Sequence, residues 1–306
     1  MSGHAALVLE PPISLFNPAL LLYAFLALVS VIVAIKTKVS KHSALRSQVF
    51  SWWIITPILT AALIIYPIGL TLLTLLICGL AAKELDTHLQ NHRWRFRIFC
   101  VLILALTLAQ NAISYPLYLL IFSILFVAQT FAYLMRPTAG NLIALLFSLT
   151  CFSMGSLIQF SSLPQQAGNG RFWLVYLLTI TAFNDVAQYT FGKLFGRQKI
   201  AKRISPNKTW QGLFGGIAVS IAISLALGGY LRLATHLHLV VLGLGLAIAG
   251  FAGDILLSAA KRFLGIKDFS NLIPGHGGIL DRVDSLIVTA PLLYFVLLAN
   301  LIGSNQ

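Results

Sequence analysis

The chain has 306 residues, of which 58% are hydrophobic and only 9% are charged. Soluble domains carry about 25% charged residues and about 45–50% apolar ones, so this composition excludes a soluble protein and indicates an integral membrane protein. The 21 lysines and arginines against 8 acids give a net charge of +13. In a soluble protein that excess would indicate nucleic-acid binding, but here it must first be compared with membrane topology.

Long apolar runs predict the fold class. A membrane-spanning helix needs about 20 mostly apolar residues, and ten runs come close enough to predict an all-α, polytopic helical bundle. We expect the spans at 19–35, 50–66, 68–82, 98–112, 115–135, 139–160, 172–191, 212–231, 239–257 and 285–303. The three cysteines all lie inside such runs and match no metal or disulfide spacing.

The loop charges predict the orientation of the bundle. If the N-terminus is outside and the spans alternate, all lysines and arginines except Arg171 and Arg232 fall in inside loops. The positive-inside rule predicts this segregation, and ten spans then place the C-terminus outside as well. Most of the net charge is thus explained by topology and anionic headgroups, so we expect membrane lipids and no nucleic acid as partners.

The acids are distributed unevenly along the chain. Five of the eight fall at or after Asp185, which itself lies within an apolar span. Ionisable groups at membrane depth are expensive and usually mark a functional cavity. We therefore divide the chain into N-terminal spans, residues 1–171, which form a scaffold facing lipid or a partner copy, and a catalytic membrane domain, residues 172–306. The catalytic domain has cytoplasmic loops at 192–211 and 254–284.

The last cytoplasmic loop carries the residues with the clearest spacing. Asp254, Ser258 and Lys261 follow one another at i, i+4 and i+7, which places them on one face of a helix. Asp281 and Asp284, at i and i+3, are expected to share a face at the start of the last helix.

Glycines in the same loop indicate that backbone approaches a ligand. Pro274-Gly275 and Gly277-Gly278 flank His276 and predict a turn. Carboxylate and hydroxyl oxygens suit Mg²⁺, and lysine and arginine suit polyphosphate, so the mixture predicts a site for Mg²⁺ and a nucleoside triphosphate. The alternative is that the cations only set the topology and the acids are their salt-bridge partners.

A second cytoplasmic segment precedes the span at 212–231. Lys208-Thr209 is similar to the end of a phosphate-binding P-loop, but position 207 is asparagine where that motif needs glycine, so we reject this interpretation. Ser205 and Thr209 either contact phosphate or cap the following helix.

Together these segments resemble the phosphatidate cytidylyltransferase (CDP-diacylglycerol synthase) family, over roughly residues 180–285. The signature is Ser258…Lys261-Arg262…Lys267-Asp268…Pro274-Gly275-His276-Gly277-Gly278…Asp281-Arg282…Asp284. Two earlier segments are similar to the motifs that precede it, Asp185…Tyr189-x-Phe191-Gly192-Lys193 and Ser205-Pro206-x-Lys208-Thr209-Trp210-x-Gly212.

The resemblance implies transfer of the CMP moiety of CTP to phosphatidate, giving CDP-diacylglycerol and pyrophosphate. It implies a homodimer in the inner (plasma) membrane with the site on the cytoplasmic side, and Mg²⁺ with K⁺ as an optional second cation. The implied metal site is Asp254, Ser258, Asp281 and Asp284. We expect Lys261, Arg262, Lys267, His276 and Arg282 to be catalytic, and Asp185, Ser205, Lys208, Thr209, Gly277 and Gly278 to bind substrate. For His276 the alternatives are a phosphate or ribose contact, a structural turn, and a proton shuttle.

Two alternatives to this function stay open. Leu257 stands where many family members have an acid, and Gln188 lies in a stretch that also departs from the family pattern, so a paralogue could use another lipid phosphate. A different class, a multi-pass carrier of an anionic metabolite, would line its route with Asn184, Asp185 and Gln188. Carriers often contain inverted repeats, and the sequence shows no such symmetry.

Overall fold

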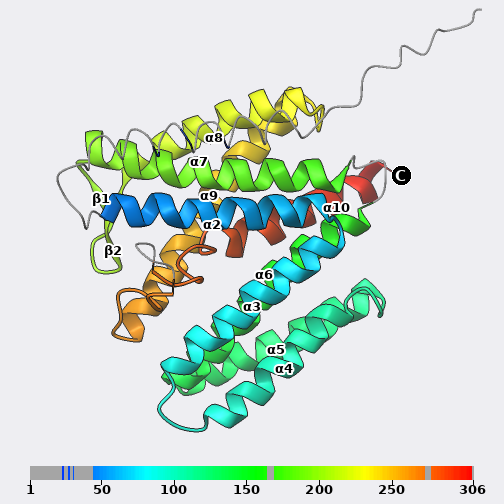
Figure 1. Cartoon of the computed structure of the whole chain (residues 1–306), viewed down its shortest axis with the longest axis vertical. Helices are drawn as coiled ribbons and strands as arrows, with labels where there is room; N and C mark the ends of the chain where they lie inside the picture. Colours follow the sequence, from blue (N-terminus) through cyan, green and yellow to red (C-terminus); the bar gives the residue numbers. More distant parts are fainter. Residues whose placement is uncertain are drawn as a thin grey trace, which may run out of the picture.

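The computed structural model describes residues 23, 27, 30, 44–163, 169–272 and 277–304. Within these residues the chain forms nine α-helices, one short 3-10 helix and two short strands (Figure 1). The helices are α2 (Ala44–Ile64), α3 (Ile68–Thr87), α4 (Arg93–Ala109), α5 (Tyr115–Met135), α6 (Ala139–Gln159), η1 (Phe160–Ser162), α7 (Gly170–Phe195), α8 (Trp210–Tyr230), α9 (His236–Phe263) and α10 (Leu286–Ser304). Strands β1 (Lys199–Ala201) and β2 (Ser205–Thr209) connect α7 to α8.

Nine of the ten predicted spans correspond to these helices. The first, 19–35, lies outside the described residues apart from three positions. Among the described residues, five helices are long and apolar enough to cross a membrane, namely α3, α5, α6 extended through η1, α8 and α9. The predominantly helical architecture is confirmed, whereas the total of ten spans and the sides of the two termini stay predictions.

Side-chain caps fix the starts of several helices. The Thr138 hydroxyl accepts a hydrogen bond from the Asn141 N–H at 3.2 Å at the start of α6, and the Thr209 hydroxyl accepts one from the Gly212 N–H at 3.1 Å at the start of α8. The first N–H groups of a helix have no partner within it, so these caps satisfy donors that would otherwise be unpaired.

The helices pack in two groups. Helix α9 contacts α7, α8 and α10, and α7 also contacts α8 and α10. Helix α6 contacts α3, α4 and α5, and contacts between α6 and α10 join the two groups. Figure 1 shows α3 to α6 running obliquely to α7 and α8. One continuous cluster of buried apolar side chains includes residues of both groups, such as Ile143, Tyr176 and Leu293. Cys78, Cys100 and Cys151 are buried and free, as expected.

Small residues let α8 approach α7 closely. A Cβ added to Gly212 would lie 2.6 Å from the Gln188 carbonyl oxygen, and one added to Gly216 would lie 2.7 Å from Asn184 Oδ1. Small residues at helix interfaces are typical of membrane bundles, where close backbone packing replaces the hydrophobic driving force. This packing brings the polar side chains of α7 next to the start of α8.

The segment predicted as a cytoplasmic loop at 192–211 contains the end of a helix and a short β-hairpin, within a fold that is otherwise helical. Helix α7 continues to Phe195, and β1 and β2 then pair in antiparallel fashion, Lys199 with Thr209 and Ala201 with Ser205. The segment Ser-Pro-Asn-Lys-Thr has few residues that favour strands. The hairpin is therefore set by cross-strand pairing and by its contacts with α7, α8 and α9.

Candidate active site

A cluster of charged side chains lies where β2, α7 and α9 meet. Lys208 on β2 forms an ion pair with Asp254 on α9, and its ammonium donates a hydrogen bond to Gln188 Oε1 on α7 at 2.9 Å. The two charged side chains are only 17% and 21% exposed. The ammonium also lies 5.5 Å from the centre of the Phe251 ring. Lys208 thus ties the hairpin to both helices.

The shared helix face predicted from residue spacing is confirmed on α9. The Ser258 hydroxyl donates a hydrogen bond to Asp254 Oδ1 at 3.2 Å, and Lys261, less than one turn further, points to the loop before α10. Helix α9 continues to Phe263, so Asp254 lies inside the helix and not in a loop, where the predicted cytoplasmic loop 254–284 placed it. The Ala-Ala-Lys-Arg stretch favours this extension because its residues have high helix propensity.

Asp281 is held on both of its carboxylate oxygens. Its Oδ1 accepts a hydrogen bond from the Lys261 ammonium at 2.6 Å. Its Oδ2 accepts the backbone N–H groups of Phe269 and Gly278, both at 3.0 Å. The Asp281 and Lys261 side chains are 4% and 12% exposed. This arrangement pins the loop between α9 and α10 to the last turn of α9.

The shared helix face predicted for Asp281 and Asp284 is wrong. Helix α10 begins only at Leu286, and both acids precede it in a turn in which the Arg282 and Val283 N–H groups donate to the Ile279 carbonyl. Because no regular helix runs through them, the i, i+3 rule does not apply. Asp281 therefore turns to Lys261, while Asp284 has Asp254, Asp185 and Arg282 as its charged neighbours.

Three carboxyl groups from three segments influence one another electrostatically. Burial raises the pKa of Asp284, and the nearby Asp254 and Asp185 carboxylates raise it further. The Ser285 hydroxyl lies 3.0 and 2.9 Å from the two oxygens of Asp185 and donates to them, and the Ser285 N–H donates to Asp284 Oδ1 at 2.9 Å. Such repulsion is relieved when a cation lies among the acids.

The donor set fits Mg²⁺ in composition. Within the described part of the chain, no three His, Cys, Asp or Glu residues are grouped closely enough to hold a metal ion by themselves. Mg²⁺ usually needs only one or two protein carboxylates, with waters and substrate phosphates completing its shell. Asp254 and Asp284 are suitable donors of this kind.

The other predicted substrate-binding residues have structural contacts of their own. Of the two alternatives given for Ser205 and Thr209, a phosphate contact or a helix cap, the structure shows the cap for Thr209, at the start of α8. Ser205 instead pairs with Ala201 in the hairpin. Gly277 has a φ of +81°, in the left-handed region that favours glycine. Gly278 donates its N–H to Asp281.

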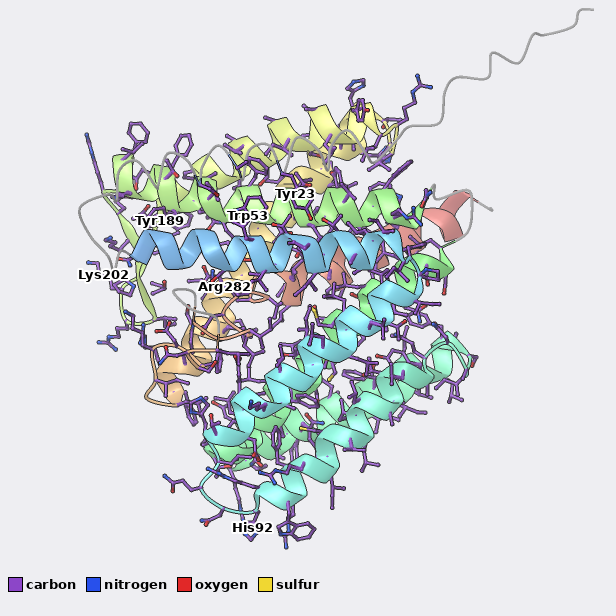
Figure 2. The ribbon with its side chains drawn as sticks, in the orientation of Figure 1. Tyr23, Trp53, His92, Tyr189, Lys202 and Arg282 are labelled. Atoms are coloured by element: carbon purple, nitrogen blue, oxygen red, sulfur yellow. The ribbon has the colours of Figure 1, made fainter. Side chains whose placement is uncertain are left out.

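The predicted catalytic cations are placed differently from one another. Arg262 donates from Nε to the Ile204 carbonyl at 3.1 Å and from Nη1 to the Ile266 carbonyl at 3.3 Å. It therefore connects the backbone of the hairpin to the backbone that follows α9. Lys267 and Arg282 are exposed. Figure 2 shows Arg282 in the turn before α10. His276 lies outside the described residues.

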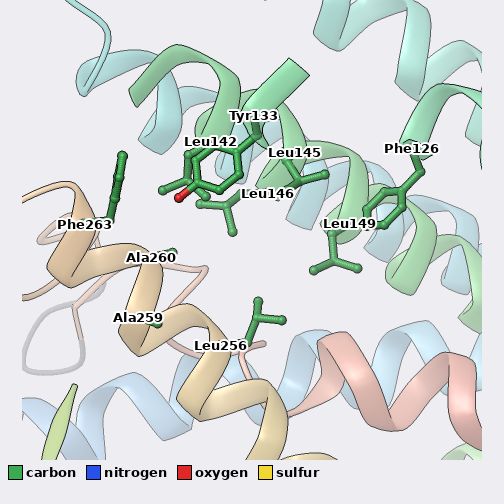
Figure 3. A pocket seen from close by; sticks show the side chains of 10 residues that line it. All are labelled: Phe126, Tyr133, Leu142, Leu145, Leu146, Leu149, Leu256, Ala259, Ala260 and Phe263. Carbon is green, nitrogen blue, oxygen red and sulfur yellow. The ribbon is translucent and has the colours of Figure 1, made fainter. Parts of the chain in front are cut away.

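An apolar cavity of about 320 Å³ lies on the other face of α9 (Figure 3). Helix α9 contributes Leu256, Ala259, Ala260 and Phe263 to its wall, and α5 and α6 contribute the rest. At 100° per residue these positions lie opposite Asp254 on the helix. The cavity is therefore separate from the charged cluster.

Sequence reasoning missed Glu84 on α3. It is buried and accepts hydrogen bonds from Ser270 and from the backbone of Ile279 and Leu280. The one local signal for Glu84 is its place as an acid at the end of a long apolar run. Nothing in that local pattern connects it to the signature loop. Gln188 and Ser285, which contact Lys208 and Asp185, were likewise not assigned these roles.

These features define a helical membrane protein with a cluster of acids and cations where α7, α9 and a short hairpin meet. Residues 46–299 match the profile of the Cytidylyltransferase family. The chain belongs to this family, which confirms the resemblance carried by the signature residues.

The curated relatives each match less than half of this chain. It is 41% identical over 148 residues to the uncharacterized protein YnbB of Escherichia coli K12, covering 48% of this chain and 50% of that protein. It is 42% identical over 121 residues to the phosphatidate cytidylyltransferase of Brucella suis biovar 1 (40% and 45% covered) and 37% identical over 129 residues to that of Bacillus subtilis 168 (42% and 48% covered). The chain thus spans about half the length of the curated relatives it matches.

Proposed function

We propose that this protein transfers CMP from CTP to phosphatidate, producing CDP-diacylglycerol and pyrophosphate. The observation that carries the proposal is the cluster of Lys208, Asp254 and Asp284, which come from three separate segments of a chain that belongs to the cytidylyltransferase family. Relatives named phosphatidate cytidylyltransferase supply the substrate class.

The chemistry needs no nucleophilic side chain. A phosphate oxygen of phosphatidate is already anionic and attacks the α-phosphorus of CTP. The new O–P bond forms as the bond to the β-phosphate oxygen breaks, and pyrophosphate leaves in line. The work of the protein is then to position the two substrates and to neutralise charge.

In this proposal Asp254 and Asp284 hold Mg²⁺, which supplies charge neutralisation on the triphosphate. Ser258 orients Asp254 through its hydrogen bond. We assign Asp281, expected from the sequence to be a ligand, to holding the loop, because its oxygens already accept three hydrogen bonds. Lys261 shares that role, and a K⁺ ion beside Mg²⁺ stays an expectation from the family resemblance.

The cations divide into those that bind phosphate and those that organise the site. We propose that Lys208, now paired with Asp254, turns its ammonium to a phosphate group when substrates bind. Arg282 is exposed and lies near Asp185 and Asp284, and its guanidinium suits bidentate phosphate binding. Arg262 fixes the hairpin backbone at Ile204. We further propose that the protein works as a homodimer with its site at the cytoplasmic face of the inner membrane, where positive loops are favoured.

The contacts of α7 favour an enzyme over a carrier. Asn184 is fully buried and lies within 3.4 Å of the Ala247 carbonyl and the Ser220 hydroxyl. Asp185 binds Ser285, and Gln188 accepts a hydrogen bond from Lys208. Side chains that would have to line a polar route are thus bound to neighbouring helices.

The test uses purified protein in liposomes with labelled CTP, Mg²⁺ and phosphatidate. We expect lipid-linked CMP and pyrophosphate in equal amounts, abolished by EDTA. Product with another lipid phosphate but none with phosphatidate would show that the acceptor is wrong. Accumulation of CTP inside the vesicles without pyrophosphate release would overturn the enzyme assignment in favour of a carrier.

A further inference from the structure

Glu84 is a buried acid that the proposed transfer step does not use. The residue is 3% exposed and lies near the end of α3, in the N-terminal half of the chain. Its Oε1 accepts hydrogen bonds from the Ser270 hydroxyl and the Ile279 N–H, both at 2.6 Å, and its Oε2 accepts one from the Leu280 N–H at 3.1 Å. One side chain of α3 thus binds three donors of the loop between α9 and α10.

The loop fits closely around this carboxylate. A Cβ added to Gly278 would lie 2.7 Å from both Glu84 oxygens, so any larger residue there would push the carboxylate out of this position. At His88, the residue that follows α3, the ring Nε2 lies 2.8 Å from the Phe269 carbonyl oxygen. From the other side, Asp281 binds the N–H groups of Phe269 and Gly278. The turn is therefore held between an acid on α3 and an acid of its own.

The chemistry of these contacts makes the attachment rigid. A carboxylate is an acceptor only, and hydrogen bonds to an ionised acceptor are shorter and stronger than neutral ones. A buried backbone N–H that loses its partner is costly, so the Ile279 and Leu280 amides keep the turn on α3. The same turn continues directly into Arg282 and Asp284.

We propose that Glu84 is a positioning residue for nucleotidyl transfer. Its carboxylate fixes residues 277–281 against α3 and thereby presents Arg282 and Asp284 to the triphosphate and its metal ion. This inference rests on the proposed function for its catalytic meaning, while the attachment itself can be measured independently. It gives the N-terminal helices a defined part in the site.

The first arm of the test measures amide hydrogen exchange of the full-length protein in detergent. Glu84→Gln keeps the size of the side chain but places an amide group against backbone donors. We expect exchange in peptides covering 277–283 to become at least roughly tenfold faster, the fold-change for one lost charge-assisted hydrogen bond. Ser270→Ala, a milder change, should give a smaller increase in the same peptides. Asp86→Asn is the matched control, because Asp86 lies in the last turn of the same helix but pairs with the exposed Arg97.

The second arm measures CMP transfer as a function of Mg²⁺ concentration. We expect Glu84→Gln to raise the Mg²⁺ concentration for half-maximal turnover, and excess Mg²⁺ to restore part of the activity. A residue needed only for folding would lower the active fraction without moving that midpoint.

The two arms separate the possible failures. Wild-type exchange of residues 277–283 in Glu84→Gln, or faster exchange throughout the protein, would overturn the positioning role. An unchanged Mg²⁺ midpoint with locally faster exchange would also overturn it. If the wild-type protein transfers no CMP, the proposed function fails and Glu84 has no catalytic role, even where the exchange arm shows the attachment.

Discussion

Removing the charge of Asp281 should destabilise the whole site. Lys261 Nζ and Asp281 Oδ1 are 2.6 Å apart, and the side chains are 12% and 4% exposed. Asp281→Asn leaves the lysine as a largely buried cation without its counter-charge, and breaking a buried pair in this way costs about 3–5 kcal/mol. The NH2 group of the new asparagine must also face either the Lys261 ammonium or the two backbone N–H groups that now donate to Oδ2, and all of these are donors.

This cost can be read as a change in thermal stability. At about 2–4 °C for each kcal/mol in chains of 150–250 residues, we expect the apparent melting temperature to fall by roughly 6–20 °C. The assay is tryptophan fluorescence of the protein in detergent at a fixed scan rate. CMP transfer should fall as well, because the turn that carries Arg282 and Asp284 loses its attachment to α9.

A second variant distinguishes the unpaired charge from other effects. Lys261→Met combined with Asp281→Asn removes both charges, and neutral replacement of a buried pair is often nearly neutral in stability. We expect the double variant to recover most of the lost melting temperature. Asp86→Asn is the control, because the partner of Asp86, Arg97, is 67% exposed and a pair with so exposed a member contributes only about 0–1 kcal/mol. A single variant as stable as this control, or a double variant as unstable as the single one, would refute the reasoning.

Three further predictions concern the cluster itself. Lys208→Met removes the partner of Asp254 and a proposed phosphate contact, so the KM for one substrate should rise about 10–100-fold while kcat changes less; equal losses for both substrates would indicate a folding role. Gly253→Ala places a Cβ 2.4 Å from the Asp284 carbonyl oxygen and should cost about 1–3 kcal/mol and most of the turnover, whereas Gly245→Ala on the same helix meets only a side chain at 4.0 Å and should leave melting temperature and kinetics unchanged. Asp284→Asn should raise the Mg²⁺ concentration needed for half-maximal transfer, and an unchanged titration would remove Asp284 from the metal site.

Features encoded within a few residues were predicted well. The apolar runs located the nine helices that the structure describes, because about 20 apolar residues in sequence are themselves the requirement for a span. The spacing of Asp254, Ser258 and Lys261 placed them on one face of α9, because helix geometry brings positions three and four apart together. The signature residues also located the family correctly.

Boundaries were predicted less well where polar turns meet helices. The i, i+3 spacing of Asp281 and Asp284 suggested a helical pair, but α10 begins after both. Spacing alone cannot tell a helix from a tight turn held by outside partners, and Lys261 is such a partner. The β1–β2 hairpin was not predicted, because it also depends on partners outside its own segment. Cross-strand pairing forms it, and strand propensity does not.

By itself, the sequence determined that this is a helical membrane protein, which segments carry the charged signature, and to which family it belongs. These are properties of composition and of neighbouring residues. Only the tertiary structure decided that Lys208 pairs with Asp254, that Ser285 binds Asp185, and that Glu84 holds a turn 195 residues further along the chain. Such pairs leave no local periodicity, because they depend on which helix ends meet once the apolar faces have packed.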